Sequence, residues 1–228
     1  MKWSFFFTSA IGKKIVMALS GLFLISFLIV HVGLNATIWA NDQGEMFNKA
    51  AHFMGSTIVV RIIEVGLFLF LIVHVIQGWQ LEVQNRRRRG LGYQKPLGER
   101  GSKWYSRTMG LLGTIIFLFL VMHIAHFWVP SRVTQNLPEV TYGFTETHNL
   151  YAKMLDVFKN PIVVILYVLG CISLMYHLMH GFQSGFRTMG VHNRKYLAML
   201  KGIGYGFAII VSLAFAMMPV SMYLGWIK

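Results

Sequence analysis

Nine histidines occur in this chain of 228 residues, and six of them lie in long apolar stretches. These six are His31, His74, His123, His126, His177 and His180. Because an ionisable side chain is costly to place in hydrocarbon, each of these imidazoles is expected to have a partner. A neutral imidazole is a common metal ligand and a frequent axial ligand of haem iron. Metal or haem binding is therefore the chemistry that these residues indicate first.

The histidines occur in two kinds of sequence context. His31 and His74 each end a Leu-Ile-Val-His sequence and are followed by valine. The second context is a His-x-x-His pair, which occurs twice: His123 with His126, and His177 with His180. Residues at i and i+3 lie on one face of a helix, so either member of such a pair is available as a ligand on that face.

The elements that position these histidines are expected to be membrane-spanning helices. A span needs about 20 apolar residues at a rise of about 1.5 Å per residue. The chain is 55% hydrophobic, and five segments reach this length, at about 15–39, 58–80, 109–129, 162–185 and 203–226. We therefore predict an all-α membrane protein, a bundle of five transmembrane helices formed by a single domain over residues 1–228.

The sequence also predicts where some of these helices begin and end. Pro130 is expected to end the third span, and Asn160 with Pro161 to form the cap and first turn of the fourth. The first apolar stretch is too long for the core of a signal peptide, so it is interpreted as an uncleaved span. A short surface helix is expected around Tyr151 to Phe158.

Basic residues set the predicted orientation. The net charge is +13, and basic side chains gather between spans two and three and between spans four and five. They are Arg86, Arg87, Arg88, Arg89, Lys95, Arg100, Lys103 and Arg107 in the first segment, and Arg187, Arg194, Lys195 and Lys201 in the second. By the positive-inside rule both segments face the cytoplasm, as does the N-terminus with Lys2, while the C-terminus lies outside. This placement disfavours nucleic acid binding.

Depth in the membrane pairs the histidines. In this orientation His31 and His123 lie in the outer halves of spans one and three, and His74 and His177 lie in the inner halves of spans two and four. Helix rise separates the two levels by about 10 Å. Two stacked b-type haems, each with two axial histidines, would fit these levels and carry electrons across part of the membrane. His126 and His180 lie nearer the surface than their partners require, so His123 and His177 are preferred.

Two non-haem interpretations of the histidines remain open at this point. A lone intramembrane histidine is more often a hydrogen-bond partner between helices than a ligand. The His-x-x-His pairs are alternatively sites for zinc or another transition metal, although no carboxylate or thiolate supports them.

Other polar residues near the membrane faces are candidates for binding. Arg107 and Arg187 on the inner side, and Arg61 on the outer side, are candidates to contact anionic haem propionates. Glu64 lies three residues after Arg61 and well inside the second span. The two side chains could neutralise each other, or they could mark, with His52, a site where a quinol loses protons.

The single cysteine, Cys171, limits the chemistry further. One cysteine excludes disulfides and cysteine-ligated iron–sulfur clusters within the chain. The sequence contains no Cys-x-x-Cys-His, so any haem is not covalently attached.

Several stretches resemble a known family. They are Phe47-Asn-Lys-Ala-Ala-His-Phe-Met54, the two Leu-Ile-Val-His contexts, His177-Leu-Met-His-Gly181 and Phe186-Arg-Thr-Met-Gly190. Over essentially its whole length the chain resembles the cytochrome b membrane-anchor subunit of succinate:quinone oxidoreductases, the succinate dehydrogenase and fumarate reductase family, of the single-chain, five-helix, di-haem type.

The resemblance implies two haem b cofactors, an outer one held by His31 and His123 and an inner one held by His74 and His177. It also implies a quinone, menaquinone or menaquinol, near the outer haem. An iron–sulfur subunit and an FAD-containing flavoprotein would dock on the cytoplasmic face, and the dicarboxylate chemistry would belong to the flavoprotein. The chain would then be a multi-pass protein of the bacterial inner membrane and part of a respiratory chain.

One position departs from part of the family. Some members have a glutamate two residues before the ligand of the fourth helix, where it serves proton movement, and this chain has Met175. That proton route is therefore not expected here.

Two other functions are alternatives to the membrane anchor. One is a free-standing transmembrane cytochrome b without soluble partner subunits. The other is a non-haem transporter in which the histidines relay protons or metal ions.

Overall fold

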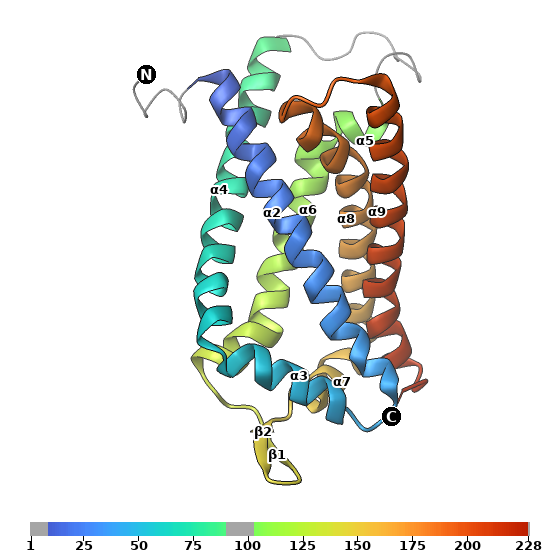
Figure 1. Ribbon diagram of the computed structural model, residues 1–228. Coiled ribbons are helices and arrows are strands. Elements are labelled where there is room, and N and C mark those ends of the chain that lie inside the picture. The colour runs from blue at the N-terminus through green and yellow to red at the C-terminus, as the bar shows by residue number, and fades with distance from the viewer. Residues whose placement is uncertain (1–8, 90–102, 228) are drawn as a thin grey trace. The chain divides into compact units, whose positions relative to one another are not determined.

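The computed structural model of the protein describes residues 9–89 and 103–227 (Figure 1). Five of its helices are long and apolar enough to cross a membrane, which confirms the predicted five-span, all-α class. They are α2 (Ala10–Ala36), α4 (Ile58–Arg89), α6 (Met109–His123) together with the π-helix η2 (Ile124–Val133), α8 (Pro161–Thr188) and α9 (Arg194–Tyr223). The first is prolonged by the 3₁₀ helix η1 (Thr37–Ala40).

The described helices extend beyond several predicted ends. α2 begins at Ala10, where the Ser9 hydroxyl accepts a hydrogen bond from the backbone N–H of Gly12 at 3.0 Å. α9 begins at Arg194, where the side chain of Asn193 accepts from the backbone N–H of Lys195 at 2.9 Å. Hydropathy detects only the part of a helix that crosses hydrocarbon, whereas caps like these set where the helix itself begins. The Asn160 cap is confirmed, with its side chain accepting from the N–H of Ile162 at 2.9 Å.

The predicted end of the third span at Pro130 is wrong. The chain continues from α6 into a π-helix, η2 (Ile124–Val133), which contains Pro130. The N–H of Thr134 donates to the carbonyl of Val129 at 3.0 Å just after it. Proline lacks the N–H that an α-helix would use at its position, and a local change to the wider π-helical turn lets the chain continue past it.

Part of the predicted basic segment can be placed. The run from Arg86 to Arg89 forms the last turn of α4. Lys95, Arg100 and Lys2 lie outside the described residues.

Backbone contacts divide the chain into two compact units, and each of the five long helices contributes a segment to both. Of the described residues, unit 1 comprises 9–27, 67–89, 103–115 and 173–209, and unit 2 comprises 28–66, 116–172 and 210–227.

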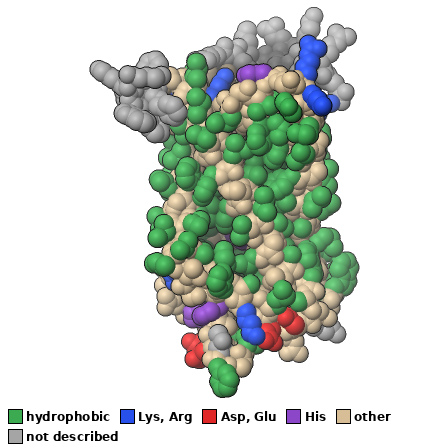
Figure 2. Space-filling model, viewed as in Figure 1, with side chains coloured by type: hydrophobic (Ala, Val, Ile, Leu, Met, Phe, Trp, Pro, Cys, Tyr) green, Lys and Arg blue, Asp and Glu red, His purple; other side chains and the backbone are tan. Residues whose placement is uncertain are grey.

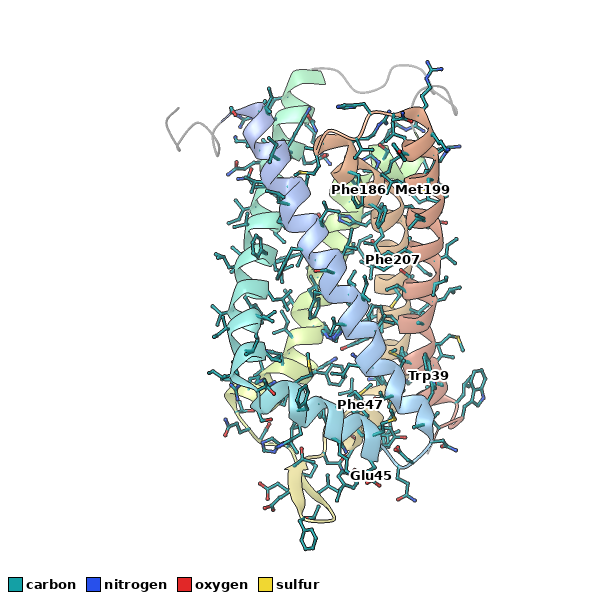
Figure 3. The ribbon with its side chains drawn as sticks, viewed as in Figure 1. Trp39, Glu45, Phe47, Phe186, Met199 and Phe207 are labelled. Carbon is teal, nitrogen blue, oxygen red and sulfur yellow. The ribbon has the colours of Figure 1, made fainter. Side chains whose placement is uncertain are left out.

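In unit 1, close contacts join neighbouring helices. The Ser173 hydroxyl of α8 donates to the carbonyl of Leu112 in α6 at 3.0 Å. Phe182 of α8 packs on Phe207 of α9 with ring centroids 6.1 Å apart; Phe207 is labelled in Figure 3. The short helix α5 (Trp104–Arg107) also belongs to this unit.

Unit 2 holds the short elements. They are α3 (Glu45–Ser56), α7 (Leu150–Phe158) and a hairpin of β1 (Glu139–Tyr142) and β2 (Thr145–His148). In Figure 1, α3 and α7 lie side by side and the hairpin extends from them. α7 confirms the predicted surface helix, whereas α3 and the hairpin were not predicted. Phe47 of α3, labelled in Figure 3, is buried in the apolar core of this unit together with Tyr151 and Phe158 of α7.

Asn48 connects these short elements by hydrogen bonds and is completely buried. Its amide nitrogen donates to the hydroxyl of Tyr142 at 2.9 Å and to the side-chain oxygen of Asn149 at 3.1 Å. Its amide oxygen accepts from the N–H of Tyr151 at 3.0 Å. One side chain of α3 therefore fixes both the hairpin and the start of α7.

Large apolar side chains remain exposed along the long helices. Ile62, Val65, Leu118, Ile165 and Ile210 are all more than half exposed. In Figure 2, hydrophobic side chains cover the visible face of the long helices, and the charged side chains that can be seen lie near the helix ends. Such a surface is stable in lipid, where backbone polar groups are satisfied within each helix. The chain is a multi-pass membrane protein.

Candidate functional site

In unit 1, two histidines from different helices face each other. His74 comes from α4 and His177 from α8, and their ring centroids are 6.1 Å apart with an angle of 67° between the planes. The depth argument from the sequence pairs these same two residues.

In unit 2 a second pair has nearly the same spacing. His31 of α2 and His123 of α6 have ring centroids 5.8 Å apart and perpendicular planes, at 90°. The ring of Phe215 in α9 lies 5.5 Å from that of His31, and the ring of Phe119 lies 5.6 Å from that of His123. This pair therefore lies among aromatic side chains.

The spacing of both pairs fits two imidazoles on opposite sides of one metal. With metal–nitrogen distances of about 2 Å, two such rings have centroids about 6 Å apart. Among the described residues, the buried Nδ1 atoms of His123 and His177 have no hydrogen-bond partner. Neither of these rings is therefore committed through Nδ1 to a hydrogen bond between helices.

The remaining intramembrane histidines differ in their surroundings. Nδ1 of His126 lies 3.0 Å from the hydroxyl of Tyr167, a buried residue of α8. His180 follows His177 by one turn on α8 and is partly exposed. His126 thus has a protein partner, whereas His123, one turn earlier, faces His31.

Two side chains on α2 contact ring nitrogens of the paired histidines. The Ser20 hydroxyl lies 3.2 Å from Nδ1 of His74. The Asn35 amide nitrogen donates to the carbonyl of His31 at 2.8 Å and lies 3.4 Å from Nδ1 of the same residue. Neither residue was singled out from the sequence, since a serine or asparagine in an apolar helix is equally typical of ordinary helix packing.

The environment of Glu64 differs from the one expected. Its carboxylate accepts a hydrogen bond from the Trp128 indole at 2.5 Å and lies 3.6 Å from Nε of Arg132. Arg61 instead donates from Nε to the carbonyl of Gly55 at 2.8 Å. Arg132, not Arg61, is therefore the cation that the structure pairs with Glu64.

Arg132 was missed because Pro130 was expected to end the third span. With the helix continued as η2, Arg132 lies one turn after Trp128, and both side chains contact Glu64. The sequence signal that could have indicated this pairing is a basic residue, Arg132, only two positions after Pro130.

The structure also locates the other candidate residues from the sequence. Arg107 ends α5 and Arg187 lies exposed in the last turn of α8, both in unit 1 with the His74–His177 pair. His52 lies exposed on α3 in unit 2.

Among residues 9–89 and 103–227, no three His, Cys, Asp or Glu side chains form a group that could hold a metal ion. A haem iron needs only an axial pair from the protein, since the porphyrin supplies its other ligands. A facing pair of histidines therefore fits a haem, which needs two protein ligands, better than a metal ion held by protein side chains alone.

The fold and the site define a class, the α-helical multi-pass membrane proteins with two facing pairs of intramembrane histidines. The chain is similar to the succinate dehydrogenase cytochrome b558 subunit of Bacillus subtilis (strain 168), with 26% identity over 167 residues. The alignment covers 72% of this chain and 72% of that protein. No protein-family model matches the chain. No solved structure matches it.

This similarity confirms the resemblance to cytochrome b membrane anchors that the sequence motifs indicated. Taken with the five membrane-capable helices, it makes the chain a multi-pass inner-membrane protein.

Proposed function

We propose that the chain is the di-haem cytochrome b membrane anchor of a succinate dehydrogenase or fumarate reductase complex. In this role it transfers electrons between an iron–sulfur subunit and a membrane quinone. The observation that carries the proposal is that each unit contains two facing histidines. The ring centroids are 6.1 Å apart for His74 and His177 in unit 1 and 5.8 Å apart for His31 and His123 in unit 2. The similarity to a succinate dehydrogenase cytochrome b558 subunit supports it.

In this proposal the paired imidazoles are the axial ligands. His31 and His123 hold the outer haem b, and His74 and His177 hold the inner one. When bound, each haem would supply a one-electron redox centre for electron transfer. The protein holds the two rings of each pair with centroids 5.8 Å or 6.1 Å apart, and the rings of Phe215 and Phe119 lie beside the His31–His123 pair. Arg107 and Arg187 are proposed contacts for the propionates of the inner haem.

The proposed quinone site lies in unit 2, with the outer haem. Glu64, Arg61 and His52 are its candidate residues, and menaquinone or menaquinol is the proposed substrate. The Glu64 carboxylate is 20% exposed and is held by Trp128 and Arg132, so it is a carboxylate of fixed position within a membrane-spanning helix. Its proposed role is to lie beside a quinol at this site.

The orientation and partners complete the proposal. Arg86 to Arg89 at the end of α4, with Arg194, Lys195 and Lys201 in α9, would face the cytoplasm. This basic face would receive the iron–sulfur subunit, with the FAD-containing flavoprotein beyond it. The B. subtilis relative is by name a subunit of succinate dehydrogenase.

A dithionite-reduced minus oxidised visible spectrum of the purified chain tests the haem assignment, with haem quantified as the pyridine haemochrome. We expect two haem b per polypeptide with low-spin spectra. A chain purified from its native membrane without haem would overturn the proposal and favour a transporter that uses the same histidines.

Purification under mild detergent conditions separates the anchor from a free-standing cytochrome b. The anchor is expected to co-purify with an iron–sulfur protein and a flavoprotein that oxidises succinate or reduces fumarate. A di-haem chain that is always isolated alone would favour the free-standing cytochrome.

A further inference from the structure

Ser20 is a polar side chain in the apolar part of α2, and it is only 1% exposed. Its hydroxyl oxygen lies 3.1 Å from the carbonyl of Met17, one turn earlier on the same helix. It also lies 3.2 Å from Nδ1 of His74 on α4. Both contacts lie within unit 1, where His74 faces His177.

The two contacts together favour one position for the ring proton. Both are hydrogen bonds at once only when the single hydroxyl proton of Ser20 is donated to Met17, because a carbonyl oxygen only accepts. In that arrangement the hydroxyl oxygen accepts from His74, and Nδ1 of His74 carries the proton. In this tautomer of the neutral imidazole, Nε2 keeps its lone pair and is the nitrogen free to bind a metal.

The next residue on α2 leaves room for the same ring. A Cβ atom added at Gly21 would lie 3.2 Å from Cε1 of His74 and 3.6 Å from Nδ1. This is tighter than ordinary van der Waals contact at Cε1, so a side chain at position 21 would press on the imidazole. Ser20 and Gly21 thus contact the ring of His74 from one helix, by a hydrogen bond and by close packing.

The opposite ring of this pair has no such support. Among the described residues, the buried Nδ1 of His177 has no hydrogen-bond partner. The two ligands proposed for the inner haem therefore differ, because only His74 has a hydrogen bond to Ser20.

We propose that Ser20 and Gly21 are positioning residues for His74, which set its tautomer and ring orientation for axial ligation of the inner haem. This inference rests on the proposed function. A ligating histidine that donates its second N–H to an acceptor is oriented by that bond and becomes a stronger donor to the metal. Stronger donation favours the ferric state, so the Ser20 hydroxyl lowers the reduction potential of the inner haem.

A redox titration of the purified complex, followed by haem absorbance, tests this inference with the variant Ser20→Ala. The step that disappears in His74→Ala identifies the inner haem. We expect Ser20→Ala to raise the midpoint of that step and to leave the outer step unchanged. Loss of the inner haem alone would equally support a positioning role. Two unchanged midpoints, or a shift confined to the outer haem, would overturn it.

Ser26→Ala is the matched control. Ser26 lies on the same helix and in the same unit, and its hydroxyl donates to the carbonyl of Phe23 at 2.7 Å, but it is exposed. Removing this hydroxyl is expected to shift neither midpoint. A shift as large as that of Ser20→Ala would show a general helix effect and would overturn the inference.

Gly21→Ala provides a second test that does not depend on the hydroxyl. The added methyl group presses on the ring of His74, so the low-spin ferric electron paramagnetic resonance signal of the inner haem should shift. The control is Gly33→Ala on the same helix, where an added Cβ meets nothing within 4 Å. An unchanged inner-haem signal in Gly21→Ala would contradict the packing role of this residue.

These experiments separate the inference from the proposed function. A wild-type chain without two haems would remove the proposed function itself. A wild-type chain with two haems, whose midpoints are unaffected by Ser20→Ala, would leave the function standing and remove only the role of Ser20.

Discussion

The hydroxyl of Tyr167 lies 3.0 Å from Nδ1 of His126, and the two rings are nearly parallel, at 8°, with centroids 5.9 Å apart. This contact explains how two histidines one turn apart on one helix can differ in role. His126 satisfies its ring nitrogen with a protein hydroxyl, whereas His123 faces the ring of His31. The His-x-x-His pair of unit 2 therefore contains one histidine with a local partner and one proposed ligand.

We expect His123→Ala to lose one haem and His126→Ala to retain both. In His126→Ala the Tyr167 hydroxyl loses its partner, which should cost about 1–3 kcal/mol of stability without removing a ligand. The pyridine haemochrome of each purified variant gives the number of haems per chain. Loss of a haem in His126→Ala, with two haems kept in His123→Ala, would move the outer ligand by one helical turn.

The same comparison applies to unit 1. His74→Ala and His177→Ala should each remove one haem, because each deletes one of two axial ligands, and both should remove the same haem. His180→Ala should keep two. Reduced minus oxidised spectra resolve which absorbance component is lost. If His74→Ala and His177→Ala remove different haems, the pairing within unit 1 is wrong.

Much of the fold followed from the hydropathy pattern, because membrane helices must satisfy their backbone hydrogen bonds internally and must be long enough to cross the bilayer. The pairing of the histidines could also be predicted from the sequence, because helix rise and the positive-inside rule are enough to assign each ring a depth in the membrane. The surface helix α7 was predicted from the length of the segment between spans three and four. Whether these rings bind haem stays a prediction.

Other features depended on tertiary contacts that leave no periodic signal. α3 begins after Gly44 in a left-handed conformation, with φ of 82°, and the side chain of Asp42 accepts from the N–H of Met46. The role of Ser20 required knowledge of which residue faces it on α4. The contact of Arg132 with Glu64 was not predicted because proline usually ends a helix. Here the chain continues past Pro130 as the π-helix η2.

Asn48→Ala should destabilise unit 2 markedly. The substitution leaves the buried N–H of Tyr151 without its acceptor and removes two further hydrogen bonds, to Tyr142 and Asn149. A buried donor left unsatisfied costs about 1–3 kcal/mol, so we expect a loss of at least that size. Thermal unfolding in detergent, followed by circular dichroism, measures it.

Lys49→Ala is the control for this variant. Lys49 is the next residue on α3, and it pairs with Glu45 at 2.5 Å on the surface, where the two side chains are 50% and 44% exposed. Exposed ion pairs contribute about 0–1 kcal/mol, so this substitution should change stability little. Equal losses of stability in the two variants would show that the buried hydrogen bonds of Asn48 contribute no more than an exposed ion pair.

The pairing of Glu64 with Arg132 predicts a non-additive double variant. Arg132→Gln leaves the Glu64 carboxylate within a membrane-spanning helix without its cation, and Glu64→Gln leaves the guanidinium without its anion, so each single change should destabilise the chain by about 1–3 kcal/mol. The double variant leaves neither charge unpaired and should lose less stability than the sum of the two single variants, with a coupling energy of about 1 kcal/mol.

The control cycle uses Lys159 and Asp156, whose charged atoms are 3.5 Å apart but whose side chains are 76% and 67% exposed. Solvent screening should reduce that coupling to less than about 0.5 kcal/mol. Unfolding midpoints of the four chains in each cycle provide the comparison, and additive effects of Glu64→Gln and Arg132→Gln would show that the two charges act independently.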